Sequence, residues 1–397
     1  MPGLKSRLTL KLGLLLGLAT VAGVTARAQW EVVTPAPTTA DLRGIHNVGN
    51  GVAWASGTEG TVLRTINDGK DWQRCATPLD ADHLDFRGIQ AFDASTAIVM
   101  SSGKGPLSRL YKTADGCKTW KLLFTNPDSE GFWDDIRFDL REPKISSSNW
   151  RARLTGVLIG DPVSGKFVVF KTTNSGDTWK PWGSDKSETA AQCRKDESLF
   201  AASNSSAIAP GINGPFAFIT GGKGGARLFL AEPHSPFDNG TTWKFRTFDL
   251  PMASSESAGA FSLAARTSNL FADLMAVGGD YKNSDAQGTA VFIPNRAPAH
   301  NLFSNPATAS THPPHGYRSA VAYDAASKTW ITAGPNGTDI STDDGRNWRA
   351  LRPNPALGEA IDADQHWNAL SLPFVVGPHG RIGKLRSDAL TPAKGGK

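Results

Sequence analysis

The chain has 397 residues, of which 39% are hydrophobic and 20% charged, and it contains 41 Gly, 25 Pro and 12 Trp but only three Cys. This content of Gly and Pro excludes a helical bundle, and the length is sufficient for a large core. The formal net charge of +5 suggests a basic protein, but the excess is confined to one end of the chain.

The first predicted element is a secretory signal peptide over residues 1–28. It has a basic start at Lys5, Arg7 and Lys11, an apolar run over 12–24, and an A-x-A cleavage site ending at Ala28. The run is too short for a comfortable membrane span, and no later run approaches about 20 residues. The sequence therefore predicts an exported protein, periplasmic or extracellular, with no membrane span.

Removal of this segment takes away four of the 42 basic residues and none of the 37 acidic ones, which leaves 38 basic residues in the mature chain. The mature chain is then almost neutral. Because nucleic-acid binding needs a basic surface, we expect no nucleic-acid partner.

A short pattern recurs five times after the signal peptide: a hydroxyl residue, any residue, Asp or Asn, any residue, Gly and, three residues later, Trp. The copy at 236–243 lacks the first hydroxyl, and Cys117 replaces Gly in the second copy. An Asp or Asn side chain accepts backbone N–H groups two residues on, and Gly supplies a positive φ. The Trp covers the turn and buries about 150–250 Å². We assign a structural role to these pairs: Asn67 and Trp72, Asp115 and Trp120, Asn174 and Trp179, Asp238 and Trp243, and Asp343 and Trp348.

A second pattern gives the number of repeats. Seven β-rich runs end at a glycine: Gly57, Gly103, Gly160, Gly221, Gly278, Gly334 and Gly377. Together the two patterns predict an all-β, seven-bladed β-propeller with four-stranded antiparallel blades. We expect the blades near 41–79, 84–127, 131–183, 198–250, 256–294, 315–352 and 364–386.

The seventh repeat has room for only three strands. Residues 30–33 can supply the fourth, which closes the ring and removes an exposed edge. The predicted single domain therefore spans 29–390, with surface excursions at 184–197 and 295–314 and a disordered tail at 391–397.

These octets resemble the Asp-box, or BNR, repeat of β-propellers, and the resemblance covers nearly all of the mature chain. In such a meander the Asp boxes lie on one face of the ring. The opposite face carries the start of each first strand and the loop after each second strand. We expect charged and aromatic binding residues to converge there: Arg43, Arg87, Lys104, Lys223, Lys282, Tyr317, Arg318 and His379.

Two interpretations of this face remain open. Arginine forks bind carboxylates bidentately, so Arg43, Arg87 and Arg318 can form a cleft for an acidic partner or a carboxylated sugar. Alternatively, they pair with the acidic residues of the same face and merely hydrate a channel. Those residues are Asp134, Asp135, Asp161 and Asp280.

The chain is also distantly similar to sialidases, which would imply a glycoside hydrolase. That family has a characteristic Phe-Arg-x-Pro, whereas Phe86-Arg87-Gly88-Ile89 lacks the proline, and no Glu lies obviously beside Tyr281 or Tyr317. A general glycosidase needs two carboxylates about 5–10 Å apart. The catalytic candidates are Asp134, Asp135, Asp161, Asp280 and Tyr281.

The chain is more similar to the propellers related to photosystem II stability and assembly factors and their exported bacterial relatives. The resemblance is carried by residues 64–72, 85–89, 109–113, 278–282 and 317–321. It implies a non-enzymatic binding or assembly role, in which a monomer recognises a protein or glycan through an arginine-lined face.

We expect neither a cofactor nor a metal ion. Residues 221–225 lack the G-x-G-x-x-G spacing of a dinucleotide site, and His312 and His315 have no Cys or acid at ligand spacing. Cys75 and Cys117 fall on adjacent blades, so a disulfide is expected after export, which leaves Cys193 unpaired. The alternative is three ordinary thiols.

Overall fold

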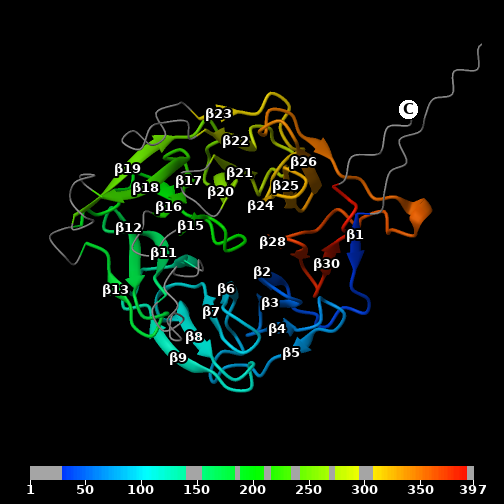
Figure 1. Cartoon of the computed structure of the whole chain (residues 1–397). Helices are drawn as coiled ribbons and strands as arrows, with labels where there is room; N and C mark the ends of the chain where they lie inside the picture. The colour runs from blue at the N-terminus through cyan, green and yellow to red at the C-terminus, as the bar shows by residue number, and fades with distance from the viewer. Residues whose placement is uncertain are drawn as a thin grey trace, which may run out of the picture.

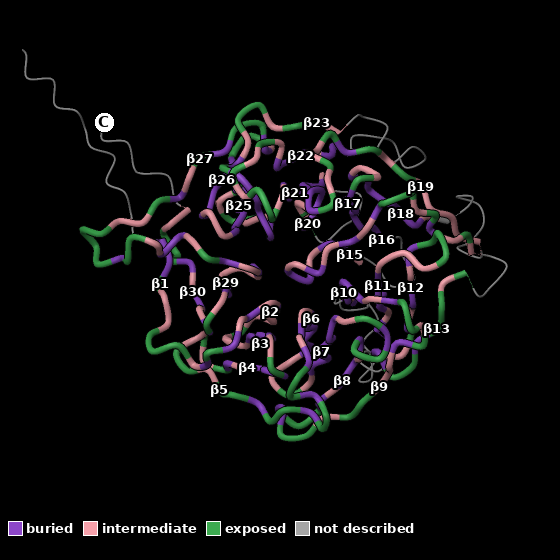
Figure 2. Tube along the Cα trace, turned by 180° about the vertical axis from the view of Figure 1, so that it is seen from behind, coloured by how far each residue is buried: buried purple, intermediate pink, exposed green. Residues whose placement is uncertain are grey.

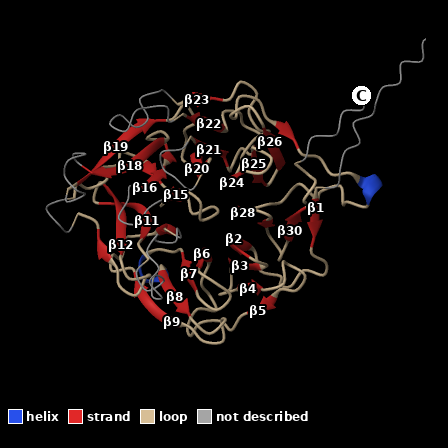
Figure 3. Cartoon of the chain, viewed as in Figure 1, coloured by secondary structure: helices blue, strands red, loops and turns tan. Residues whose placement is uncertain are grey.

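The computed structural model describes residues 29–139, 154–183, 188–209, 216–233, 242–267, 273–294 and 307–390. The predicted signal peptide, the tail 391–397 and Asp238 lie outside these ranges. The described residues form β-strands and two short 3-10 helices, Gly105–Leu107 and Pro355–Leu357. Figure 3 shows strands and loops throughout the ring.

Seven antiparallel sheets are arranged in a closed ring, as Figure 1 shows. Blades 1 to 3 consist of β2 (Leu42–Gly49), β3 (Val52–Gly57), β4 (Val62–Thr65) and β5 (Gln73–Arg74); β6 (Phe86–Ala91), β7 (Ala97–Ser101), β8 (Arg109–Thr113) and β9 (Lys121–Thr125); and β10 (Trp133–Phe138), β11 (Gly156–Val163), β12 (Lys166–Thr172) and β13 (Lys180–Pro181).

Blades 4 to 6 consist of β15 (Ala207–Ile208), β16 (Phe216–Ile219), β18 (Arg227–Pro233) and β19 (Trp243–Asp249); β20 (Ala258–Ala265), β21 (Leu274–Asp280), β22 (Ala290–Ile293) and β23 (Thr308–Ala309); and β24 (Ala320–Asp324), β25 (Thr329–Gly334), β26 (Gly337–Ser341) and β27 (Arg349–Ala350). The short strands β14 (Glu197–Ser198) and β17 (Gly221–Gly222) extend the sheet of blade 5 along β20.

The N-terminal strand closes the ring as predicted. Blade 7 contains β28 (Ala369–Ser371), β29 (Phe374–Val376) and β30 (Ile382–Leu385), and β1 (Trp30–Val32) pairs antiparallel with β30. Trp30 is opposite Leu385 in this register, and Trp30 packs against Trp367 with ring centroids 5.9 Å apart. The seven-bladed, four-stranded fold is therefore confirmed.

The hydrophobic core lies between neighbouring blades. For example, Leu42 and Ile45 of blade 1 share one apolar cluster with Phe374 and Val376 of blade 7. Figure 2 shows buried residues in the body of the ring and exposed residues along its rim. Each blade thus buries both of its faces, as the sheets of a propeller require.

Two connections differ from the sequence prediction. The outer strand of blade 5, β23, lies inside the stretch 295–314 that was expected to be a surface excursion. The other excursion, 184–197, ends at Glu197, which is buried and accepts hydrogen bonds from the Arg227 guanidinium and the Thr220 hydroxyl. The described part of each segment therefore adds a strand to the sheet of blade 5, β14 in one case and β23 in the other. Neither difference was visible in the hydrophobic pattern.

The described turns at the repeated octets share one hydrogen-bond pattern. In each, the Asp or Asn Oδ1 accepts the backbone N–H of the residue four positions on, at 3.0 Å, in place of the expected residue two positions on. These acceptors are Asn67, Asp115, Asn174 and Asp343. The Ser or Thr hydroxyl accepts the N–H at the Gly position, at 3.0–3.1 Å. The hydroxyl and the carboxyl or amide therefore fix the turn jointly.

The residue at the Gly position of these turns also contacts the preceding blade. At Gly345 φ is +71°, and an added Cβ would lie 2.3 Å from the Met275 side chain of blade 5. Cys117 takes the same left-handed conformation, with φ of +64°. Trp72 likewise meets Phe374 of blade 7 edge to face, with centroids 5.7 Å apart. The turns thus lie at the joints between blades.

The disulfide between Cys75 and Cys117 is present as predicted, with a sequence separation of 42. It joins the residue after β5 of blade 1 to the second octet turn, which connects β8 and β9 of blade 2. Trp120 donates from its indole nitrogen to the Ala76 carbonyl at 2.8 Å in the same joint. Cys193 is half-buried and free.

The turn carboxylates should make a pH-dependent contribution to stability. Hydrogen bonds from Thr119, chiefly from its side chain, lower the pKa of Asp115. A folded pKa below the unfolded value of about 3.9 stabilises the protein above that pH, and the contribution is lost as the pH falls through the folded pKa. We expect Asp115→Ala to lower Tm at pH 7 by on the order of 2 °C, with the difference from wild type shrinking below about pH 4.

Asp115→Asn is the matched control, because Asn67 and Asn174 make the same backbone contact in other turns. Thermal melts of the three proteins from pH 7 to pH 3 provide the measurement. A difference between wild type and Asp115→Ala that stays constant over this range would contradict the expected linkage.

Candidate functional site

The ring has two faces. We call the face at which β2, β6, β10, β20 and β24 begin the start face, and the face with the octet turns the turn face. The inner strands run from the first to the second. Figure 1 shows a segment before β15 projecting into the centre of the ring.

This central segment, residues 201–206, is named the plug. Its hydrogen bonds reach four other blades. Asn204 accepts the Ile136 N–H of blade 3 at 3.0 Å and donates to the Ile89 carbonyl of blade 2 at 3.2 Å. Ser203 donates to the Ser319 carbonyl beside blade 6, and Ser205 donates to the Ser262 hydroxyl of blade 5. Residues expected to begin blade 4 therefore fill the channel.

The start face carries an arginine pair at the channel mouth. Arg87 donates from Nε to Asp85 at 2.8 Å and from Nη1 to the Ala201 carbonyl of the plug at 3.0 Å. Arg43 lies 3.6 Å from the Asp41 carboxylate and 3.8 Å from that of Asp85. In the described part of the chain Arg43 makes no hydrogen bond, and its side chain is 28% exposed. Of the two arginines, Arg43 therefore has the more guanidinium N–H groups without a hydrogen-bond acceptor among the described residues.

Arg318 does not line this mouth. Its side chain is only 1% exposed, and the guanidinium is paired with the buried Asp339 of β26 and with the Tyr317 carbonyl. The pairing interpretation therefore holds for Arg318, because the partner carboxylate comes from the third strand of the same blade.

The lysines predicted on this face have carboxylate partners. Lys104 pairs with Glu130 at 2.7 Å, and Lys223 pairs with Glu256 at 2.5 Å. The hydrogen bond from Lys223 is the main cause of a lowered pKa of the Glu256 carboxyl. The positive charges of Lys223 and Lys282 lower this pKa further. His379 lies 3.9 Å from Asp41.

The catalytic candidates divide into two groups. Asp134 and Asp135 are almost fully buried, and burial raises the pKa of Asp134, with the neighbouring Asp161 carboxylate as the next cause. Asp280 instead accepts hydrogen bonds from Ser257 and from the backbone of Lys282, and its pKa is lowered. Asp280 therefore orders its own loop, whereas Asp134 is a buried carboxyl whose raised pKa is increased further by the charge of Asp161.

An aromatic cluster completes the mouth opposite the arginines. Phe200 stacks on Phe261 at 4.0 Å, and Tyr317 meets Phe261 edge to face at 4.8 Å. Tyr281 packs on the same two Phe rings and is 49% exposed. Burial raises the pKa of Tyr317, while the charges of Arg87 and Arg43 act in the opposite direction. The structure thus brings Arg43, Arg87, Tyr281 and Tyr317 together.

A cavity of about 700 Å³ opens at the other end of the channel, on the turn face. Its lining includes His46, Gln90 and Arg137 in one corner, Ser205 of the plug, and apolar residues from the ends of the inner strands. None of these polar residues was singled out from the sequence. The strand period of two places Asp135 and Arg137 on the same side of β10, which was the available signal.

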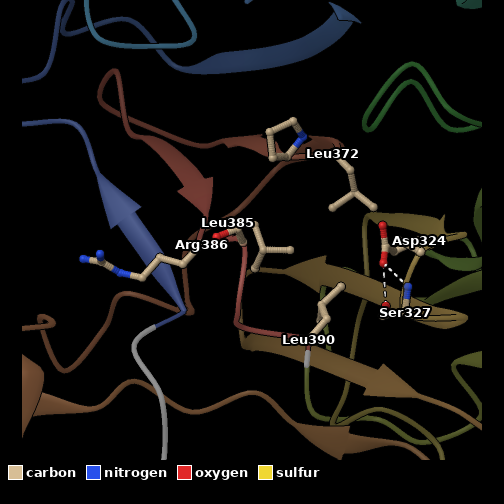
Figure 4. Close-up of a pocket in the computed structure, with 9 residues that line it drawn as sticks. Asp324, Ser327, Leu372, Leu385, Arg386 and Leu390 are labelled. Carbon is tan, nitrogen blue, oxygen red and sulfur yellow. Dashed lines mark hydrogen bonds between the residues drawn. The ribbon is translucent and has the colours of Figure 1, made fainter. Parts of the chain in front are cut away.

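A second cavity, of about 480 Å³, lies where blade 6 meets the closing blade (Figure 4). Its walls include Leu372, Leu385 and Leu390. The Asp324 carboxylate beside it accepts hydrogen bonds from the Ser327 backbone and hydroxyl. That carboxylate therefore fixes a turn.

The described residues contain no group of three or more His, Cys, Asp or Glu side chains arranged to hold a metal ion. In the same residues, no helix is long and apolar enough to cross a membrane.

Comparisons with known proteins define the class by fold. The sequence matches no protein-family model and no curated protein. The chain is similar to the solved structure of YCF48 from Cyanidioschyzon merolae, at 17% identity over 91% of this chain and 100% of that one, with a TM-score of 0.56. A structure of YCF48 bound to D1 peptide is similar at 14% identity over 90% of this chain and 97% of that one, with a TM-score of 0.54.

A GH74 enzyme from Niastella koreensis is similar at 13% identity over 92% of this chain, with a TM-score of 0.50. This chain spans 61% of that enzyme. At these identities the likeness shows the shared propeller fold.

Proposed function

We propose that this chain is an exported, monomeric, non-enzymatic scaffold that binds a protein or glycan partner at the charged mouth of the start face. The octet turns serve as Asp-box turns that hold the blades, in the manner of assembly-factor propellers. The observation that carries the proposal is Arg43, which is partly exposed, has only long ion pairs and makes no hydrogen bond among the described residues.

The surroundings of Arg43 favour a partner with a carboxylate. A guanidinium fork binds carboxylates bidentately, and the exposed ring of Tyr281 offers an apolar surface across the mouth. Tyr and Arg are enriched among the residues that dominate binding energy. The similar YCF48 structure was solved with a bound peptide, which favours a protein segment over a glycan.

The test is affinity capture from the exported fraction with wild-type and variant baits, followed by a direct binding measurement on each captured partner. We expect Arg43→Gln with Arg87→Gln to weaken binding by about tenfold or more. Arg74→Gln on the outer strand β5 is the matched control and should bind like wild type. A partner that binds the double variant as tightly as wild type would overturn the proposal.

The alternative function is a sialidase-like or other glycoside hydrolase at the same mouth. Asp134 and Asp161 favour it, because burial raises the pKa of both carboxyls. However, Asp134 is only 1% exposed. We expect no turnover of a panel of fluorogenic glycosides by the mature protein. Turnover that Asp134→Asn or Tyr281→Phe abolishes would replace the scaffold proposal with the hydrolase.

Export is supported by the contacts at the expected mature N-terminus. The Glu359 carboxylate is 8% exposed and accepts the Gln29 N–H and, at 3.0 Å, the Trp30 N–H. Cleavage after Ala28 would place a positive amino group against this carboxylate, an arrangement stabilised by charge and hydrogen bonding. We expect mass spectrometry of the exported protein to give Gln29 as the first residue; retention of residues 1–28 would contradict the export proposal.

A further inference from the structure

The turn-face cavity is independent of the proposed partner site, because it lies at the opposite end of the channel behind the plug. We propose that this cavity binds a small organic monocarboxylate, a molecule with one carboxylate on an apolar body. Three features of its described lining support this: the size of the cavity, the free amino groups of the Arg137 guanidinium and the apolar walls.

The size fits a small ligand. Pockets for small molecules typically have volumes of about 300–1,000 Å³, and this cavity has about 700 Å³. Ser205 of the plug contributes to its lining, and Ile208, Leu263, Val321 and Leu370 supply apolar surface. Such walls favour an apolar body, since the transfer of apolar surface out of water is favourable.

Arg137 supplies the carboxylate anchor. Its Nε lies 3.1 Å from Asp135 Oδ1, and the other Asp135 oxygen accepts the Ser206 hydroxyl at 3.0 Å and the Ala207 N–H at 2.8 Å. The guanidinium is therefore held from its Nε side. Within the described ranges its terminal amino groups make no hydrogen bond, and the side chain is 21% exposed. These amino groups form a preset fork for a second carboxylate.

The other titratable groups in the described lining of the cavity are either uncharged or have partners of their own. Burial, and then the charge of Arg137, lower the pKa of His46 to about 3, so the imidazole is neutral. Arg266, also in the lining, pairs with Asp273 and Asp344. Asp139 has an interaction partner of its own. Among the described lining residues, Arg137 is the guanidinium with both terminal amino groups free of hydrogen bonds, and Asp135 already offsets its charge. A ligand with a single carboxylate is therefore better matched than a phosphate or a dicarboxylate.

His46 and Gln90 add uncharged polar groups beside the anchor. His46 Nδ1 accepts the Ala91 N–H at 3.3 Å, and His46 Nε2 lies 2.9 Å from the Gln90 amide nitrogen. The polar corner and the apolar wall together define an amphipathic ligand.

The test uses octanoate as the probe and 1-octanol as its uncharged counterpart, with titration calorimetry on the mature protein. Octanoate should bind at least about tenfold more tightly than 1-octanol. Arg137→Gln should weaken octanoate binding by about tenfold or more. Arg43→Gln at the opposite mouth should leave it unchanged, which separates this proposal from the partner site.

Arg137→Gln leaves Asp135 without its ion pair, so a thermal melt must show that the variant is folded. Ala264→Phe is the second variant: it fills the cavity from its lining and keeps the Arg137–Asp135 pair, and we expect it to abolish octanoate binding. Equal binding of octanoate and 1-octanol, unchanged binding to folded Arg137→Gln or to Ala264→Phe, or no binding up to about 5 mM would each overturn the proposal.

Discussion

Replacement of Arg318 by Gln is expected to lower the free energy of unfolding by about 3–5 kcal/mol, because it breaks a buried ion pair by removing one partner. Asp339, which is 3% exposed, would lose the guanidinium that neutralises it. Asp364 is also buried, and burial raises the pKa of its carboxyl. Its two carboxylate oxygens have no hydrogen-bond partner among the residues that the structure describes. The variant would leave two uncompensated acidic groups near each other.

Chemical denaturation at pH 7 measures the effect. Arg349→Gln is the matched control, because Arg349 lies exposed on the outer strand of the same blade, and its change should stay within about 0.5 kcal/mol. Replacement of both partners, Arg318→Met with Asp339→Leu, should recover much of the loss, since apolar substitutes for a buried pair are often neutral. A loss below about 1 kcal/mol for Arg318→Gln would show that the pair contributes little.

Removal of the disulfide is the second large effect. Its sequence separation of 42 corresponds to about 4 kcal/mol in the chain-entropy model. We expect Cys75→Ser with Cys117→Ser to lower the free energy of unfolding by about this amount. Cys193→Ser is the matched control and should change it by less than about 1 kcal/mol.

Denaturant unfolding of both variants, with and without reductant, makes the comparison. Reductant should destabilise wild type and Cys193→Ser and leave the double variant unchanged. A double variant as stable as wild type would mean that the joint between blades 1 and 2 is held by packing alone.

The architecture was predictable because it repeats. The glycine stops recur in all seven blades and the octets in five of them, so the ring, the number of blades, the closing strand and the disulfide could be inferred without coordinates. The reason is physical: a hairpin turn is specified by residues within eight positions of one another.

The chemistry of the channel was less predictable because it depends on contacts between distant segments. Arg318 resembled Arg43 and Arg87 at the start of an inner strand, but Asp339 neutralises it from another strand of its blade. The serine-rich plug has the composition of a surface loop, and its bonds to Ile89, Ile136 and Ser319 appear only after the blades are placed. Arg137 gave no local signal beyond the strand alternation shared by every inner strand.

The pairing of β1 with β30 also constrains how the molecule is made. β1 cannot form its strand pairing until β30 has been synthesised, because Trp30 lies opposite Leu385 in the register of the two strands. A chain truncated before Ile382 would therefore lack β30 and keep an open seam with exposed strand edges. Such edges template aggregation, so closure of the ring by β1 also protects the protein against association through its strands.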